Sequence, residues 1–299
     1  MSWTVTEPAD VAAALTAPAL RVVPPACTPG PAARLLGRMA RFSDGEEHRR
    51  RRELIVALLP PAPVVAAEAA GCTAERLAAR SGPFDVMPLA RLIPATALAC
   101  ALGLASDAAV RAAELTGRLC DALPAGDDDA DAAASGLLGL LGAWVRPDER
   151  TDAAASILFQ ARDATAALIG LALLGQLDGA EPDGAEPDCA EPGLAAVRCT
   201  WRTAVADVWL GGASGFGGAD GFGGTVLPAG AAVEISLESA RAGAGPHACP
   251  ASEHAAAIAA AFLAELDRAG WQVAGQPAEY EPRPNLRLPR QVIVSGGTS

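Results

Sequence analysis

Lysine is absent from the sequence, and all 23 of its basic residues are arginine. Lysine forms the Schiff base of pyridoxal-phosphate enzymes and contacts phosphate groups in P-loop nucleotide sites. Its absence therefore excludes both kinds of site. The preference for arginine, together with abundant alanine, glycine and proline, is typical of a GC-rich genome, and we attach no mechanism to it.

Positive charge is also scarce. The chain carries 35 acidic residues against 23 basic ones, a formal net charge of −12, and its pI is about 4.7. Proteins that bind nucleic acids usually present a basic face, so we predict no nucleic-acid partner. The first ten residues have neither a basic n-region nor an apolar h-region, so we expect no signal peptide.

Long apolar runs are missing as well. The apolar stretch 92–105 is shorter than a membrane span and contains Pro94. We therefore predict a cytoplasmic protein that does not associate with a membrane. The seven cysteines are scattered and include no C-x-x-C pair, so in a reducing compartment we expect free thiols, with one of them a candidate metal ligand.

A length of 299 residues corresponds to one large domain or two ordinary ones. Hydrophobic residues make up 51% of the chain, which is enough for a sizeable core. We expect an acidic loop at 126–130, a strand at 204–210, a hairpin over 226–237 that turns at 228–230, and short strands within 280–294. Helical periodicity predicts helices over 10–20, 46–59, 66–81, 88–104, 106–123, 152–177 and 255–269. The predicted fold class is mainly α with small β-sheets.

Two stretches have low complexity. Residues 179–193 read GAEPDGAEPDCAEPG, and this density of proline and glycine predicts a loop. Residues 211–224 read GGASGFGGADGFGG. This second stretch has no G-x-G-x-x-G fingerprint opening a helix, so a flexible turn is favoured over a phosphate-binding loop.

The most informative segment is GAGPHACPAS at 243–252, directly before an alanine-rich helical pattern. Backbone N–H groups and the helix dipole favour the thiolate form of a cysteine at a helix N-terminus. A thiolate is a good soft ligand for iron, and the small residues before Cys249 let a flat cofactor approach the backbone. The alternative is a buried free cysteine in a tight turn.

This segment resembles the haem-binding loop of cytochrome P450s, F-x-x-G-x-H-x-C-x-G. Gly245, His247 and Cys249 match the pattern, whereas Ala242 and Ala251 stand at the phenylalanine and final glycine positions. Further family-like segments follow in the family's order: WTVTEPADVAAAL, DGEEHRRRR, LFQARDATAALIG, RTAVADVWLGG, TVLPAGAAVEI and YEPRPNLRLP. The resemblance spans nearly the whole chain and implies a truncated P450-like fold, with residues 1–299 forming a single haem-thiolate domain.

The resemblance implies haem b as the cofactor. It makes Cys249 the proximal thiolate ligand of the iron. It makes His48 and Arg52, the two ends of an H-x-x-x-R motif, together with Arg202 and His247, the residues that anchor the haem propionates. Arginine suits this role because its planar fork binds a carboxylate through two hydrogen bonds. A solvated helix face or a turn hydrogen bond is the alternative role for these side chains.

The central helix departs from the family pattern A-G-x-acid-Thr. Ala161 and Thr165 match, but Arg162 replaces the glycine and Ala164 stands at the acid position. Asp163 lies one residue early, about 100° around a helix, and so cannot simply substitute. We expect Thr165 to be either a distal hydroxyl near bound oxygen or an ordinary helix threonine. Asp163 is either a displaced relay acid or a surface carboxylate.

Two other family features are reduced. No glutamate precedes an arginine at E-x-x-R spacing where the family's core helix belongs, and the repeat 179–193 occupies that region. The meander before the cysteine loop is nearly absent. These losses leave room for a protein that departs from ordinary P450 chemistry.

Three functions remain open. The first is a P450-like haem-thiolate oxidoreductase that acts on a small organic substrate in specialised metabolism, with monooxygenase, peroxide-driven or non-oxygenative chemistry. A ferredoxin-type electron donor is then expected, and outward-facing arginines of the run 49–51 could dock it, although a solvated charge run is the simpler interpretation. The second is a P450-derived binding protein without catalysis or haem. The third is a zinc or thiol enzyme, which the absence of clustered ligands disfavours.

Overall fold

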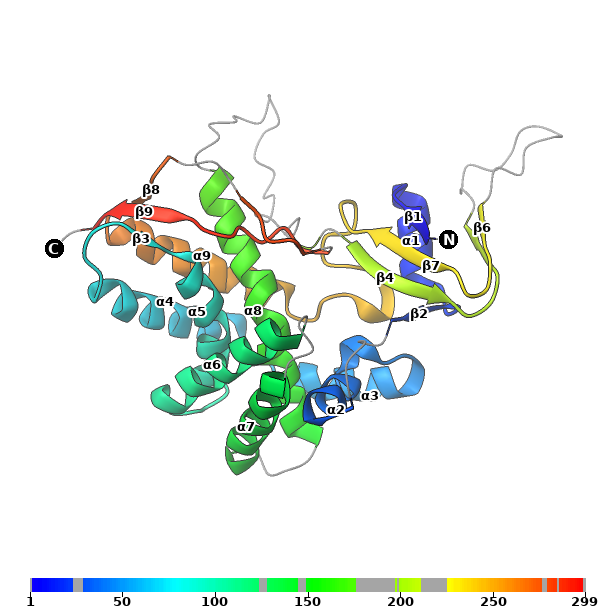
Figure 1. Cartoon of the computed structure of the whole chain (residues 1–299), viewed down its shortest axis with the longest axis horizontal. Helices are drawn as coiled ribbons and strands as arrows, with labels where there is room; N and C mark the ends of the chain where they lie inside the picture. The colour runs from blue at the N-terminus through cyan, green and yellow to red at the C-terminus, as the bar shows by residue number, and fades with distance from the viewer. Residues whose placement is uncertain are drawn as a thin grey trace.

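The computed structural model describes residues 2–23, 29–123, 128–144, 149–175, 197, 199–210, 225–275, 279–283 and 285–297. Helices dominate one side of the molecule, and a small β-sheet region forms the other (Figure 1). The described helices are α1 (Pro8–Thr16), α2 (Pro31–Gly37), α3 (Gly45–Leu58), α4 (Ala62–Ala78), α5 (Met87–Ala101), α6 (Ser106–Ala122), α7 (Asp128–Trp144), α8 (Glu149–Gly175) and α9 (Ser252–Arg268).

Helix α8 is the central element, and it runs through the middle of the molecule (Figure 1). It packs against α3, α5, α6, α7 and α9. Within the described residues it is long and apolar enough to cross a membrane by length and composition, as is the bent pair α3–α4 if counted as one span. However, 61% of the apolar window of α8 is buried inside the protein. Burial of this kind is what the core helix of a globular protein requires.

The largest sheet has four strands in the order β1-β7-β4-β2. Strand β1 (Ser2–Val5) runs parallel to β7 (Ala232–Ser236), and β4 (Cys199–Ala204) is antiparallel to both β7 and β2 (Leu20–Val22). Helix α1 covers this sheet and buries Val11 against it. The sheet therefore has a small core separate from the large helical core around α8.

Two smaller sheets complete the fold. Strand β5 (Val208–Leu210) pairs with β6 (Thr225–Leu227), and β9 (Ile293–Gly296) lies between β3 (Phe84–Asp85) and β8 (Trp271–Val273). An isolated bridge joins Tyr280 to Pro289. The short strands expected within 280–294 are thus confirmed.

The predicted helices are confirmed to within a few residues at most ends, and α5 runs unbroken through Pro94. Helix 10–20 is too long, because α1 ends at Thr16 and the chain then enters β2. The acidic loop is wrong for residues 128–130, where α7 begins. Acidic side chains in a first turn are stabilised by the helix dipole, so an acidic run can start a helix.

Two strand predictions are also wrong. Residues 204–210 form the end of β4 and all of β5, separated by a bend. The hairpin over 226–237 does not form, because β6 pairs with β5 while β7 pairs with β1 and β4. The turn between them switches sheets: Gly230 adopts φ 84° and donates its N–H to the Ala204 carbonyl at 2.7 Å. The low-complexity stretches 179–193 and 211–224 lie outside the described residues.

Candidate functional site

A compact loop joins β7 to α9 and carries Cys249. Gly243 and Gly245 have φ values of 73° and 65°, a left-handed conformation that glycine adopts at low cost. The Cys249 N–H donates to the Ala242 carbonyl at 2.7 Å, which closes the loop. Cys249 lies three positions before Ser252, the first residue of α9, so the closed loop places the cysteine just ahead of the helix.

The Cys249 side chain is exposed to solvent, so the alternative of a fully buried cysteine is wrong. The surrounding protein nevertheless raises the pKa of the thiol by desolvation, while a backbone hydrogen bond at Ala251 and the charge of Arg52 act in the opposite direction. A thiol of this kind stays protonated until a metal displaces its proton. Its accessibility and its place before a helix fit an iron ligand.

Helix α3 holds this loop through two side chains on one face. His48 Nε2 lies 2.9 Å from the Pro246 carbonyl oxygen, and its Nδ1 lies 2.9 Å from the Ala40 carbonyl oxygen. Arg52, one turn later, donates from Nη1 to the Ala248 carbonyl. The structure thus brings both residues of the H-x-x-x-R motif to the cysteine loop, where they contact its backbone.

His247 and Arg202 lie on the same side of the loop. The rings of His48 and His247 are 3.9 Å apart between centroids, and His247 Nε2 lies 3.2 Å from Asp44 Oδ1. Burial, His48 and Arg202 together lower the pKa of His247 to about 4, against the opposing effect of Asp44. Arg202 is buried in β4 and donates from Nη1 to Thr200 Oγ1 at 2.7 Å.

Arg41 is a further cation at this site, and the sequence reasoning missed it. Desolvation lowers the pKa of its guanidinium. Desolvation also lowers the pKa of Arg202, and the positive charge of Arg41 adds to that effect. Arg41 lies in a 3₁₀ turn (Ala40–Phe42) just before α3. The family pattern has no fixed position for it, so only its nearness in sequence to His48 could have drawn attention.

Arg41, Arg202 and His247, together with His48 and Asp44, form what we call the cation cluster. One carboxylate, Asp44, faces these basic side chains, and its Oδ2 also accepts the Val22 N–H at 3.1 Å. Desolvation is the largest cause of the lowered pKa values of Arg202 and His247, and neighbouring positive charge adds to it. Such a cluster suits a ligand that carries carboxylates. The donor set therefore fits a haem: Cys249 would hold its iron, and the cluster would hold its propionates.

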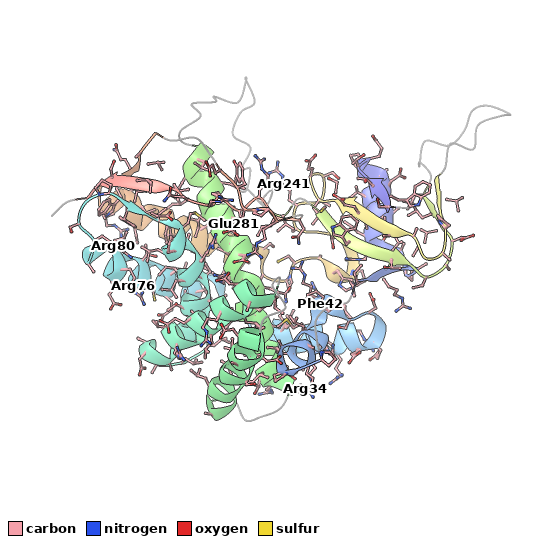
Figure 2. The ribbon with its side chains drawn as sticks, in the orientation of Figure 1. Arg34, Phe42, Arg76, Arg80, Arg241 and Glu281 are labelled. Atoms are coloured by element: carbon pink, nitrogen blue, oxygen red, sulfur yellow. The ribbon has the colours of Figure 1, made fainter. Side chains whose placement is uncertain are left out.

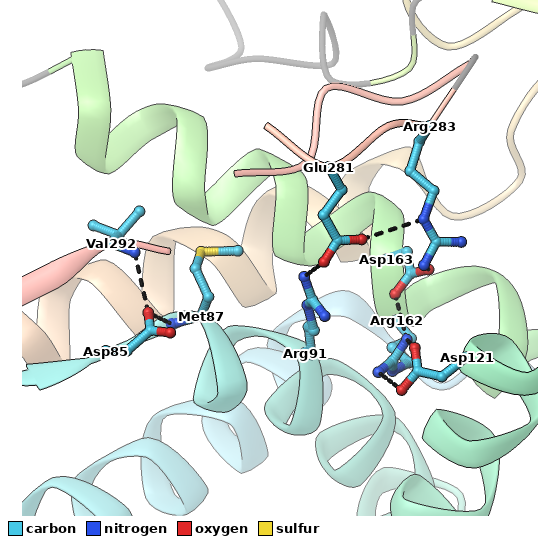
Figure 3. Close-up of polar contacts among 9 residues, drawn as sticks. All are labelled: Asp85, Met87, Arg91, Asp121, Arg162, Asp163, Glu281, Arg283 and Val292. Atoms are coloured by element: carbon cyan, nitrogen blue, oxygen red, sulfur yellow. Dashed lines mark hydrogen bonds and ion pairs between the residues drawn. The ribbon is translucent and has the colours of Figure 1, made fainter. Parts of the chain in front are cut away.

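The centre of α8 has a different character (Figure 3). Arg162, which replaces the family glycine, is buried. It donates from Nη1 and Nη2 to the two carboxylate oxygens of Asp121 in α6 at 3.0 and 2.9 Å, and from Nη1 to Asp163 Oδ1 at 2.7 Å. This paired geometry is the strong form of the arginine–carboxylate interaction.

The ion pairs continue from Asp163 toward the C-terminal segment. Arg283 Nη2 lies 3.7 Å from Asp163 Oδ2, and Arg283 Nε donates to Glu281 at 3.3 Å. Glu281 also accepts a hydrogen bond from Arg91 of α5. We call these residues the α8 ion network: Asp121, Arg162, Asp163, Arg283, Glu281 and Arg91, which join three helices and the C-terminal segment (Figure 3).

Asp163 is therefore not a surface carboxylate, because its side chain is 18% exposed and faces two guanidinium groups. Both of its oxygens have cationic partners, which also speaks against a displaced relay acid. Thr165 is buried in the same helix, at 1% exposure. The structure does not bring either residue into the cation cluster.

The remaining predictions have simple outcomes. Arg49, Arg50 and Arg51 each pair with a glutamate. Arg49 and Arg50 are solvated, as expected of a charge run, whereas Arg51 is largely covered and also donates to the Gly37 carbonyl. His254, one turn into α9, contacts the Pro60 carbonyl at 2.7 Å. Cys72, Cys100, Cys120 and Cys249 are free thiols, as expected. Within the described part of the chain, no three His, Cys, Asp or Glu residues group to hold a metal ion, so a zinc enzyme has no support there.

No protein-family model matches the chain, and no curated protein matches it. Several solved structures, in contrast, match the chain in fold. Cytochrome P450epoK bound to epothilone B superposes with a TM-score of 0.75 at 19% identity, over 100% of this chain and 92% of that one. The cytochrome P450 MoxA of Nonomuraea recticatena gives 0.73 at 16%, over 100% and 90%. The cytochrome P450 PksS of Bacillus subtilis gives 0.72 at 16%, over 99% and 91%.

The chain has the cytochrome P450 fold. The predicted fold class is thereby confirmed, and so is the family resemblance at the level of the fold. Because the chain shares only 16–19% identity with these three P450s, the match shows the fold alone. Haem binding must be inferred from the residues of this chain.

Proposed function

We propose that the protein is a P450-type haem-thiolate oxidoreductase that acts on a small organic substrate. The observation that carries this proposal is the accessible Cys249 thiol in a closed loop before α9, in the same region as the buried Arg202 and the histidines of the cation cluster. When bound there, haem supplies redox chemistry at an iron whose thiolate ligand donates electron density.

The protein side chains divide the work. Cys249 would be the ligand, Arg202 and Arg41 would hold the propionates by charge and hydrogen bonds, and His247, neutral at pH 7 because its pKa is lowered to about 4, would contribute a hydrogen bond. His48 and Arg52 act one step away, because their donors hold the carbonyls of Pro246 and Ala248 and so fix the loop that carries the ligand. We propose a single domain over residues 1–299 in a cytoplasmic protein.

The α8 ion network affects which oxidant we propose, because it contains the candidate proton-delivering acid. Asp163 lies in the helix where the family places its proton-delivering acid, but two guanidiniums hold its carboxylate. Thr165 is the candidate hydroxyl left on this stretch. We therefore favour a hydroperoxide as the oxidant, because it arrives already reduced and protonated and needs no electron donor. An oxygen-dependent reaction with a ferredoxin-type donor is the competing route.

We propose the substrate class from what the neighbours in structure bind. One of the matching P450s holds epothilone, one belongs to the bacillaene polyketide synthase system, and one is bound to a fatty-acyl carrier protein. These support an apolar organic substrate from specialised metabolism. Within the described residues we assign no substrate-contacting side chain.

The test is reconstitution with hemin, followed by the spectrum of the dithionite-reduced CO complex. We expect a red-brown protein with the thiolate-haem Soret position. The Cys249→Ser variant should lose that position, and the matched control Cys72→Ser should keep it. A protein that takes up no hemin would contradict the proposal. Substrate turnover with hydrogen peroxide, compared with turnover by ferredoxin and its reductase, then separates the two oxidants.

A second function is a binding protein of P450 origin without catalysis. The observation that favours it is the α8 ion network, which holds the candidate acid in ion pairs. Failure to take up hemin, with the fold intact by circular dichroism, would support this function and reject the first.

A further inference from the structure

Two cysteines face one another on the helical side of the molecule, apart from the cysteine loop. Cys72 lies on α4 and Cys100 at the end of α5. Both line the same cavity of about 170 Å³, and each thiol affects the pKa of the other. Arg76 lines that cavity too, and it lies at the outer edge of the helical region (Figure 2).

We propose that Cys72 and Cys100 are a dithiol modification site that a hydroperoxide oxidises to an intrachain disulfide. Both side chains are partly exposed, so a small oxidant reaches them through the cavity. This inference does not depend on haem binding, and it can be tested on the protein without cofactor.

The reaction balances with one peroxide. The first thiolate attacks a peroxide oxygen, the O–O bond breaks, and a sulfenic acid and one water are produced. The second thiol then attacks the sulfenic sulfur, the S–S bond forms, and a second water leaves. Two thiols lose two protons and two electrons in total, and the peroxide is reduced to two waters.

The surroundings of both thiols slow the reaction at neutral pH. Burial, with Cys72 and Glu68 adding to it, raises the pKa of Cys100 to about 12, and burial also raises the pKa of Cys72. Either thiol can attack the peroxide first, and the other thiol then resolves the sulfenic acid. Because both pKa values are raised, the thiolate fraction is small at neutral pH, and oxidation should accelerate with rising pH.

Two of the other described cysteines, Cys120 and Cys249, do not share this arrangement. The Cys120 sulfur is buried and lies 4.0 Å from the Phe159 carbonyl oxygen, and Cys249 belongs to the candidate ligand loop. A metal is also not the natural occupant, since no group of three ligating side chains forms within the described residues. The oxidised pair would instead cross-link α4 to α5, the helix that packs on α8.

The sequence makes the test direct. Trypsin releases residues 53–76 and 92–111 as separate peptides, each with a single cysteine. We would treat the folded, cofactor-free protein with hydrogen peroxide, block free thiols with N-ethylmaleimide, and digest it without reductant. The expected result is one disulfide-linked species of these two peptides, absent from Cys72→Ser and Cys100→Ser and retained in the matched control Cys120→Ser.

Two further readings make the test decisive. The oxidised protein should melt about 5–10 °C higher than the reduced one, since the bond closes a loop of about 30 residues, and the rise should vanish in Cys100→Ser. The proposal is overturned if the linked peptides form only in urea. It is also overturned if Cys72 or Cys100 stays open to N-ethylmaleimide after peroxide treatment at pH 9.

Discussion

The cysteine loop and the centre of α8 are the two places where P450 chemistry would meet, and they have diverged to different extents. The loop keeps its cysteine, its histidine and the arginine of β4, and it surrounds them with cations in excess of carboxylates. The centre of α8 has gained Arg162 and balances every charge internally. A region with unsatisfied charge invites a ligand, whereas a balanced network holds helices together.

The largest expected effect concerns the loop. Replacing Cys249 by serine should remove the thiolate-haem spectrum completely, because a hydroxyl is a far poorer ligand for ferric iron than a thiolate. The circular dichroism spectrum should not change, since the side chain is exposed. If the variant kept the thiolate Soret position, Cys249 would not be the ligand.

The α8 network should matter for stability rather than for cofactor binding. The Arg162→Leu variant leaves Asp121 and Asp163 without their shared partner, and we expect it to lower the free energy of unfolding by about 2–4 kcal/mol, since one side chain is nearly buried. Urea denaturation measures this loss. Arg111→Leu, which breaks the exposed pair with Glu114, is the matched control and should cost less than about 1 kcal/mol. Equal losses would show that the network is only a surface feature.

Acid should weaken the loop region specifically. The pKa of His247 is lowered to about 4 in the folded protein, so the unfolded chain binds a proton at this histidine near pH 6.5 while the folded chain does not. Stability contributed by the neutral ring is therefore complete above about pH 6.5 and is lost as the pH falls toward 4, by about 2–3 kcal/mol. Chemical denaturation between pH 7 and pH 4 should show a shallower decline in His247→Gln than in the original protein.

A smaller effect tests the cation cluster. The Arg202→Leu variant should weaken hemin binding by about 10-fold, the worth of a hydrogen-bonded charge pair with a propionate. Fluorescence quenching during hemin titration measures the affinity. Arg241→Leu, an exposed arginine of the same loop region, is the control and should bind hemin normally. Unchanged affinity in Arg202→Leu would remove this residue from the site.

The sequence was a good guide wherever a pattern is local. Helical periodicity located most helices, and the order of short segments identified the fold despite low identity to the solved P450s. The convergence of His48, Arg52 and His247 on one loop also follows the resemblance. Pairing between strands could not be foreseen, because the turn at Gly230 is compatible with a hairpin and with a change of sheet. That choice depends on β1, which lies more than 200 residues earlier in the chain.

Arg162 and Arg41 show the other limit of sequence reasoning. Arg162 could be read as the loss of a glycine, but its partner Asp121 comes from another helix, and no spacing rule connects the two. Arg41 belongs to the cation cluster only because the turn before α3 folds toward β4. Charges that meet through tertiary packing leave no periodic signal in one sequence.

The position of β7 has a consequence for the order of assembly. This strand lies between β1 and β4, so it is interior to the four-stranded sheet, yet it comes from the last quarter of the chain. During synthesis, β1 cannot pair until its partner β7 has been made, and parallel pairing over such a sequence distance is slow. The helical core, made largely from residues 31–175, can gather first. The cysteine loop directly follows β7, so the candidate site forms only after most of the chain has been made.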